Sequence, residues 1–174
     1  RDPEMSRGLG DVYKRQAESV KTYSDNLELA TVTVLKGAGD AEDCGNLIKN
    51  VWYNAIYKEK DDETDKYTRP DGYFVSDFND ALGNLFVDSS FSSKIDSIDK
   101  NQDTVNSLMK KLKNPPEEYK DAYDALSDFY DAYLALTGCA TDPSGSLQTY
   151  SSTFNDADTD TLNAYKAMQQ YLGD

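Results

Sequence analysis

One stretch of the sequence constrains the fold more than any other, because residues 17–60 predict a single long helix with an unbroken apolar seam. Apolar or small residues recur along it at alternating spacings of three and four, which is the heptad pattern of a coiled coil. Such a seam is typical of a helix that lies lengthwise in a bundle and packs its neighbours along one face. The seam consists of Val20, Tyr23, Leu27, Ala30, Val34, Gly37, Ala41, Cys44, Ile48, Val51 and Ala55.

The middle of the chain predicts a loop and two further helices. Residues 60–72 are charged, lack a period and end in a Pro-Asp-Gly turn, which indicates a loop. A short helix with an apolar face is expected next, with Ser76 as its N-cap. Asp88 is expected to cap the helix after it, which runs to Lys113.

The sharpest boundary lies at Asn114-Pro-Pro-Glu117. Proline suits the first turn of a helix, and Asn114 and Glu117 have the spacing of a capping box. Two more helices are expected over residues 115–140 and 144–172. At about 1.5 Å per residue, the lengths fit an all-α, antiparallel up-and-down four-helix bundle with one long first helix and a short extra helix. In this arrangement the first helix extends from Ile48 onward beyond the fourth and fifth helices, as an arm two helices deep.

The first sixteen residues, RDPEMSRGLGDVYKRQ, do not continue the pattern of the rest. They contain one proline and two glycines, and they resemble a translated sequencing adapter of the kind that contaminates metagenomic gene predictions. We therefore predict a non-native or disordered segment over residues 1–16 and a single helical-bundle domain over residues 17–174. If the segment is an artefact, the native N-terminus lies upstream, together with any signal peptide or lipid anchor.

Composition excludes several classes of function. The formal net charge is −14, so nucleic acid and anionic membrane are poor partners. The chain has no histidine, which excludes Ser-His and Cys-His nucleophile pairs and most zinc and di-iron sites. No run of eighteen apolar residues exists, so no transmembrane segment is expected. We expect neither an enzyme nor a cofactor or metal site.

The two cysteines leave two alternatives open. In the bundle, Cys44 and Cys139 come to nearly the same height. A disulfide needs Cα atoms within about 7 Å, whereas the first and fourth helices run parallel and can lie diagonally across the bundle. The pair is therefore either a bridge, which would indicate an extracytoplasmic protein, or two separate buried thiols.

An aromatic cluster is the candidate binding surface. It lies where the first helix meets the following loop and the short helix. If the arm is only two helices deep, some of these rings are exposed, and exposed aromatic rings often mark binding surfaces. The alternative is that they pack the thin core of the arm. The cluster consists of Trp52, Tyr53, Tyr57, Tyr67, Tyr73 and Phe74.

Three stretches carry a resemblance: Val51-Trp-Tyr-Asn54, Asn114-Pro-Pro116 and Pro143-Ser-Gly-Ser-Leu-Gln-Thr-Tyr150. They resemble uncharacterised, mostly helical secreted or lipoprotein-type proteins of Gram-positive anaerobic bacteria. The resemblance implies a location outside the cytoplasm and carries no known activity. Together these observations predict a non-catalytic, extracytoplasmic binding or interaction module for an unknown protein or small ligand, with a purely structural helical spacer or scaffold as the alternative.

Overall fold

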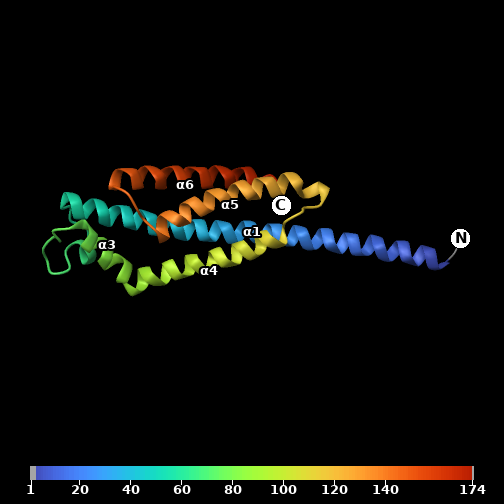
Figure 1. The fold of residues 1–174 in the computed structure, drawn as a ribbon, viewed down its shortest axis with the longest axis horizontal. Coiled ribbons are helices and arrows are strands. Elements are labelled where there is room, and N and C mark those ends of the chain that lie inside the picture. Colours follow the sequence, from blue (N-terminus) through green and yellow to red (C-terminus); the bar gives the residue numbers. More distant parts are fainter. Residues whose placement is uncertain (1–2, 174) are drawn as a thin grey trace.

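The computed structural model describes residues 3–173, and all the long elements are helices (Figure 1). Within these residues there is no strand, so the predicted all-α class with a long first helix is confirmed. The helices are α1 (Pro3–Tyr57), α2 (Asp65–Thr68), α3 (Phe78–Val87), α4 (Ser89–Lys111), α5 (Lys120–Thr141) and α6 (Leu147–Gln169), with a 3₁₀ turn η1 (Glu117–Tyr119) ahead of α5.

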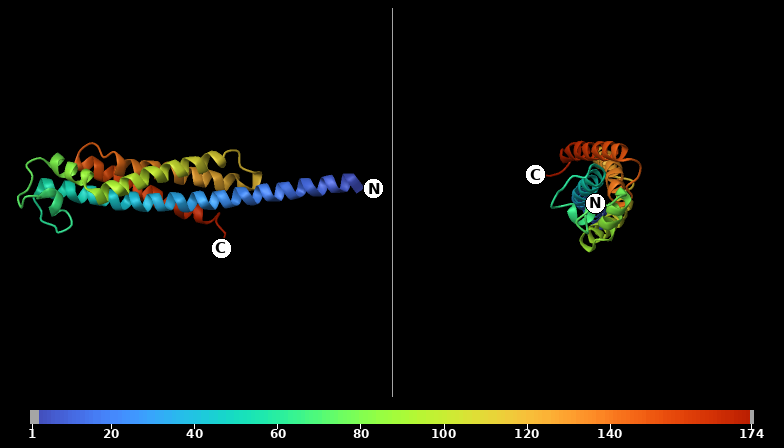
Figure 2. Two further views of the ribbon diagram at one scale, coloured as in Figure 1. Left: turned by 90° about the horizontal axis from the view of Figure 1, so that it is seen from below. Right: turned by 90° about the vertical axis from the view of Figure 1, so that its left-hand side faces the viewer.

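α1 is the axis along which the other long helices lie. α4 and α6 run opposite to α1, whereas α5 runs in the same direction (Figures 1 and 2). α1 contacts α4, α5 and α6, and α5 also packs closely against α6. α1 and α5 are therefore in direct contact although they run parallel.

The apolar seam of α1 forms the core, as the sequence predicted. Every seam residue from Tyr23 to Ala55 is buried, and Val20 is half-buried. α1 ends three residues before the predicted end because Lys58 takes a left-handed conformation with φ of 59°. None of the described helices is both long and apolar enough to cross a membrane.

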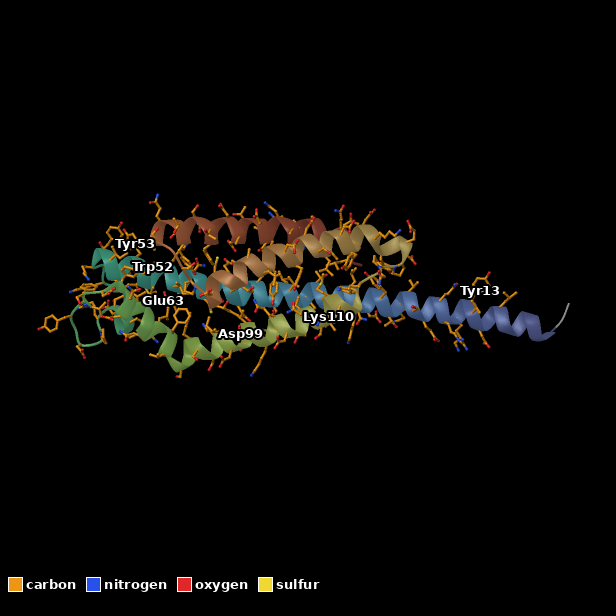
Figure 3. The ribbon with its side chains drawn as sticks, in the orientation of Figure 1. Tyr13, Trp52, Tyr53, Glu63, Asp99 and Lys110 are labelled. Atoms are coloured by element: carbon orange, nitrogen blue, oxygen red, sulfur yellow. The ribbon has the colours of Figure 1, made fainter. Side chains whose placement is uncertain are left out.

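The start of α1 differs from the prediction, because the helix begins at Pro3 and not near residue 17. Arg1 and Asp2 of the segment predicted to be non-native or disordered lie outside the described residues. Leu9, Val12 and Tyr13 are exposed. Figures 1 and 3 show this part of α1, with Tyr13 on it, projecting beyond the other helices.

Three predicted boundaries need correction. The loop over residues 60–72 contains the short helix α2, and α3 is capped by Asp77, whose side chain accepts a hydrogen bond from the backbone N–H of Asn79 at 2.8 Å. Asn114 does not cap a helix. It has φ of 61°, and α5 begins only at Lys120. Proline disfavours the α conformation of the residue before it, so Pro116 prevents Pro115 from starting a helix, and Pro116 itself is extended with φ of −54° and ψ of 153°.

Asp88 caps α4 as predicted, since its carboxylate accepts a hydrogen bond from the backbone N–H of Phe91 at 3.0 Å. That hydrogen bond, followed by the ammonium of Lys66 3.7 Å away, holds the pKa of Asp88 below its ordinary value. The same aspartate ends α3, so one side chain fixes the bend between two helices.

Two glycines of α1 allow its neighbours to approach closely. A Cβ atom built on Gly37 would lie 1.9 Å from Oδ1 of Asn101, and one built on Gly45 would lie 2.0 Å from Cε2 of Phe154. By contrast, a Cβ on Gly39 would meet nothing within 4 Å. Close packing therefore explains Gly37 and Gly45, but not Gly39.

This difference gives a test of the packing. We expect Gly45→Ala to lower the free energy of unfolding by about 1–2 kcal/mol, because the overpacking of the rigid, buried Phe154 ring outweighs the gain in helix propensity. Gly39→Ala, the matched control on the same helix, is expected to raise stability by up to about 1 kcal/mol. Urea denaturation of both variants measures the two effects. Equal stabilisation by both would contradict the close contact between α1 and α6.

Candidate functional site

The six residues of the predicted aromatic cluster do not form one surface. Trp52 and Tyr67 are buried, and Phe74 is half-buried. The Trp52 ring lies 5.5 Å from that of Phe78 and 5.4 Å from that of Tyr150, measured between centroids. Trp52 and Tyr67 therefore pack the core. This is the alternative interpretation that the sequence allowed for the cluster.

The contact between Trp52 and Tyr150 also corrects the predicted arm. Tyr150 belongs to α6, so the last turns of α1 are covered by α6 as well as by α3. In the turn between α5 and α6 the chain continues toward the C-terminal end of α1. The start of α6 therefore lies closer to that end of α1 than the end of α5 does (Figure 1). The arm is therefore more than two helices deep.

The other three rings are exposed, and they separate into two groups. Tyr73 lies in the loop before α3 and exposes 84% of its surface. Tyr53 and Tyr57 lie one turn apart on α1 and expose 48% and 58%. Their ring centroids are 4.5 Å apart and their planes are inclined by 36°, so the two rings stack on each other at a tilt. We call the ring surface that this stacked pair leaves exposed the aromatic face.

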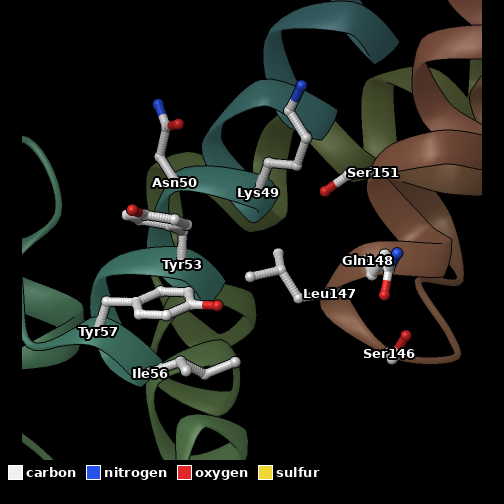
Figure 4. A pocket seen from close by; sticks show the side chains of 9 residues that line it. All are labelled: Lys49, Asn50, Tyr53, Ile56, Tyr57, Ser146, Leu147, Gln148 and Ser151. Atoms are coloured by element: carbon white, nitrogen blue, oxygen red, sulfur yellow. The ribbon is translucent and has the colours of Figure 1, made fainter.

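This aromatic face is part of a groove between the end of α1 and the start of α6 (Figure 4). The groove has a volume of about 620 Å³, within the range of roughly 300–1,000 Å³ typical of small-ligand sites. Figure 4 shows Leu147 of α6 between the two helices, opposite Tyr53 and Ile56. The lining residues are Lys49, Asn50, Tyr53, Ile56, Tyr57, Ser146, Leu147, Gln148 and Ser151.

The α6 side of the groove is fixed by a capping box. The hydroxyl of Ser146 accepts a hydrogen bond from the backbone N–H of Thr149 at 3.2 Å, and the backbone N–H of Ser146 donates to the Thr149 hydroxyl at 2.9 Å. This half of the groove was not predicted from the sequence. The Ser146–Thr149 spacing was the signal that would have started α6 at Leu147.

Lys49 is the one charged side chain that lines the groove, and it is engaged with α6. Its ammonium donates a hydrogen bond to Oδ1 of Asn155 at 3.1 Å and lies 5.0 Å from the centroid of the Phe154 ring. These two contacts draw the charge toward the second turn of α6. The part of the groove around the tyrosines is therefore uncharged.

The absence of carboxylates distinguishes this groove from three others among the described residues. A groove at the turn between α5 and α6 contains Asp142. A narrow one beside α1 contains Glu42 and Asp158, and one between α5 and α6 near the C-terminus contains three aspartates of α5. On a chain with 32 acidic residues, a groove without a carboxylate favours a ligand that carries no positive charge.

The cysteines lie on α1 and α5, and both are free and buried. Burial raises the pKa of the Cys44 thiol to about 11, and it also raises that of Cys139. The hydroxyl of Tyr150 donates to the backbone carbonyl of Cys139 at 2.8 Å. Neither thiol has the lowered pKa that marks a reactive cysteine.

No protein-family model matches the chain, and no match was found among the curated proteins or the solved structures. The described residues contain no group of three or more Asp, Glu, Cys or His side chains placed to hold a metal ion. The function is therefore argued from the groove itself.

Thiol titration tests the state of Cys44 and Cys139. At pH 8 we expect neither thiol of the native protein to react readily with a disulfide reagent, because both are buried and their pKa values are raised. After unfolding in urea without a reductant, two thiols should react. If none reacts until a reductant is added, the two cysteines form a disulfide.

Glu42 provides a test of the electrostatics beside α1. Burial, followed by the nearby carboxylates of Asp158 and Asp43, raises its pKa above the ordinary value of 4.5. The folded state therefore binds this proton more tightly than the unfolded state, and stability falls as pH rises from 4.5 through the folded-state pKa. We expect Glu42→Gln to raise Tm at pH 7 but not at pH 3. The control is Glu28→Gln, at an exposed position of the same helix. If Glu42→Gln raised Tm equally at pH 7 and pH 3, the raised pKa of Glu42 would not explain the effect.

Proposed function

We propose that this protein is a non-catalytic binding module that takes a ligand in the groove between the end of α1 and the start of α6. The observation that carries the proposal is the exposed pair Tyr53 and Tyr57, which form one aromatic face at the edge of a groove of ligand size. Exposed aromatic rings beside a concave surface are typical of recognition sites.

The chemistry of the lining supports binding and not catalysis. The groove has no carboxylate, no cysteine and no histidine, so its serine hydroxyls have no carboxylate or imidazole beside them in the lining to act as general base. Lys49 carries the one formal charge, and its ammonium is occupied by Asn155 and the Phe154 ring. What remains are aromatic, aliphatic, amide and hydroxyl groups, which bind ligands without transforming them.

The long helices would act as a rigid support for this groove. We propose that α1, α4, α5 and α6 form one antiparallel up-and-down four-helix bundle, in which α1 carries half of the groove and α6 the other half. A site built on two packed helices is held more rigidly than one built on loops. We further propose an extracytoplasmic location, as a secreted protein or membrane-anchored lipoprotein. The resemblance of residues 51–54, 114–116 and 143–150 to such proteins supports it.

A structural spacer is the second candidate, and the length of α1 favours it. Without the adapter-like segment, residues 17–57 of α1 still span about 60 Å along the length of the molecule (Figure 2). A spacer needs this length but makes no use of a groove with exposed tyrosines. The two functions therefore differ in whether the groove binds anything.

A ligand screen by NMR separates the two. The ¹⁵N-labelled protein would be titrated with separate pools of disaccharides, proline-rich peptides, free amino acids and short-chain carboxylic acids. We expect at least one pool to shift backbone resonances of residues 49–57 and 146–151, because these residues line or flank the groove.

The controls use exposed tyrosines, whose substitution should leave the fold intact. The shifts should vanish in a Tyr53→Ser/Tyr57→Ser double variant and persist in Tyr73→Ser, which removes an exposed ring that does not line the groove. If no pool shifts these resonances, the groove is not a binding site and the spacer is the better account.

A further inference from the structure

We infer that the ligand of the groove is a carbohydrate, with a pyranose ring seated on the face formed by Tyr53 and Tyr57. The inference rests on the proposed function and adds the class of ligand to it. Three features of the groove support it: the aromatic face, the type of polar groups around that face, and the charge of the lining.

The aromatic face suits a ring with C–H groups on one side. An aromatic ring is negative on its face, so it attracts the slightly positive C–H groups that a pyranose presents along one side of its ring. Tyr53 and Tyr57 stack on each other, and each exposes about half of its surface, so the outer side of the pair is a small aromatic platform. A flat aromatic ligand could stack there as well, so the polar groups must decide the class.

The polar side chains around the platform both donate and accept hydrogen bonds. Asn50 and Gln148 supply amides and Ser151 supplies a hydroxyl, whereas the Ser146 hydroxyl is engaged in the capping box of α6. Each hydroxyl of a sugar also both donates and accepts, so it can pair with either kind of group. A proline-rich peptide presents mostly carbonyl acceptors, because proline has no N–H, and would leave the acceptors of the groove without partners.

The tyrosine hydroxyls add to this set. Among the described residues, the Tyr53 and Tyr57 hydroxyls bond to no other side chain or backbone group, whereas those of Tyr23 and Tyr150 bond to the carbonyls of Leu112 and Cys139. The groove tyrosines therefore keep their hydroxyls available for a ligand. A polyhydroxylated ligand can use them.

The charge of the lining points to a neutral ligand. The groove has no carboxylate to attract a cation, and its one ammonium is engaged by Asn155. A phosphorylated or polyanionic ligand would meet the field of a chain with net charge −14 and only one cation to offset it. A neutral saccharide needs no carboxylate as a partner and is not repelled by the negative charge of the chain.

Calorimetric titration with maltose, cellobiose and N,N′-diacetylchitobiose tests the inference on the full chain. At least one of these neutral disaccharides should bind with a one-to-one stoichiometry. Tyr57→Ala should weaken that binding by about tenfold or more, because it removes half of the platform. Tyr73→Ala, which removes an exposed ring outside the groove, should change it by less than about twofold.

A second pair of variants tests the hydrogen bonds. Gln148→Leu keeps most of the side-chain volume but removes the amide, and should weaken disaccharide binding severalfold. Gln169→Leu, on an exposed position near the end of the same helix, should not. Circular dichroism and Tm confirm that each variant is folded before its affinity is compared.

The outcomes separate the ligand class from the function. Binding of a proline-rich peptide or an amino acid without any disaccharide would overturn the carbohydrate inference and leave the binding function standing. Binding of a disaccharide that is indifferent to Tyr57→Ala would overturn the site. If neither the disaccharides nor the other pools bind, the inference and the proposed function both fail.

Discussion

The close approach of α1 to its neighbours is the constraint on which the rest of the structure depends. The middle of the α1 seam carries small residues, and the large side chains that fill the space come from the other helices. Phe154 of α6 lies against Gly45, and Tyr133 of α5 together with Asn101 of α4 lies against Gly37. Without a Cβ at these two positions, three helices can pack against one at short distance.

The groove is a consequence of the same arrangement. At Gly45, α1 and α6 touch without an intervening side chain on α1. Further along, the residues of α1 that face α6 become large, and they include Lys49, Tyr53 and Ile56. α1 and α6 therefore cannot approach each other as closely there, and Leu147 fills only part of the space between them (Figure 4). The candidate site therefore lies where the small-residue seam of α1 ends.

The sequence was enough to predict the main features of the fold, because heptad periodicity directly reports which face of a helix is buried. The seam from Tyr23 to Ala55 needed no knowledge of the partners. Asn114 was misread because the capping-box spacing takes no account of the second proline, which disfavours the α conformation at Pro115 and so prevents a helix from beginning there. The division between buried Trp52 and exposed Tyr53 depends on where α6 begins, which only tertiary packing decides.

Tyrosine serves two distinct purposes in this chain, and the hydroxyl distinguishes them. Tyr23, Tyr133 and Tyr150 are buried, and each donates its hydroxyl proton to an acceptor on another element: the Leu112 carbonyl, the Asn101 amide and the Cys139 carbonyl. Burial raises the pKa of Tyr23 to about 12 and raises that of the other two, so all three stay protonated donors at physiological pH.

The groove pair is the opposite case. Tyr53 and Tyr57 contribute little buried area to the core, and their hydroxyls bond to no other described residue. Their replacement should therefore cost the fold little, whereas replacement of a buried tyrosine would leave a buried acceptor unsatisfied. Other tyrosines, such as Tyr73, are exposed as well, but Tyr53 and Tyr57 form a stacked pair beside a groove, and this pairing is what supports the proposal of a ligand there.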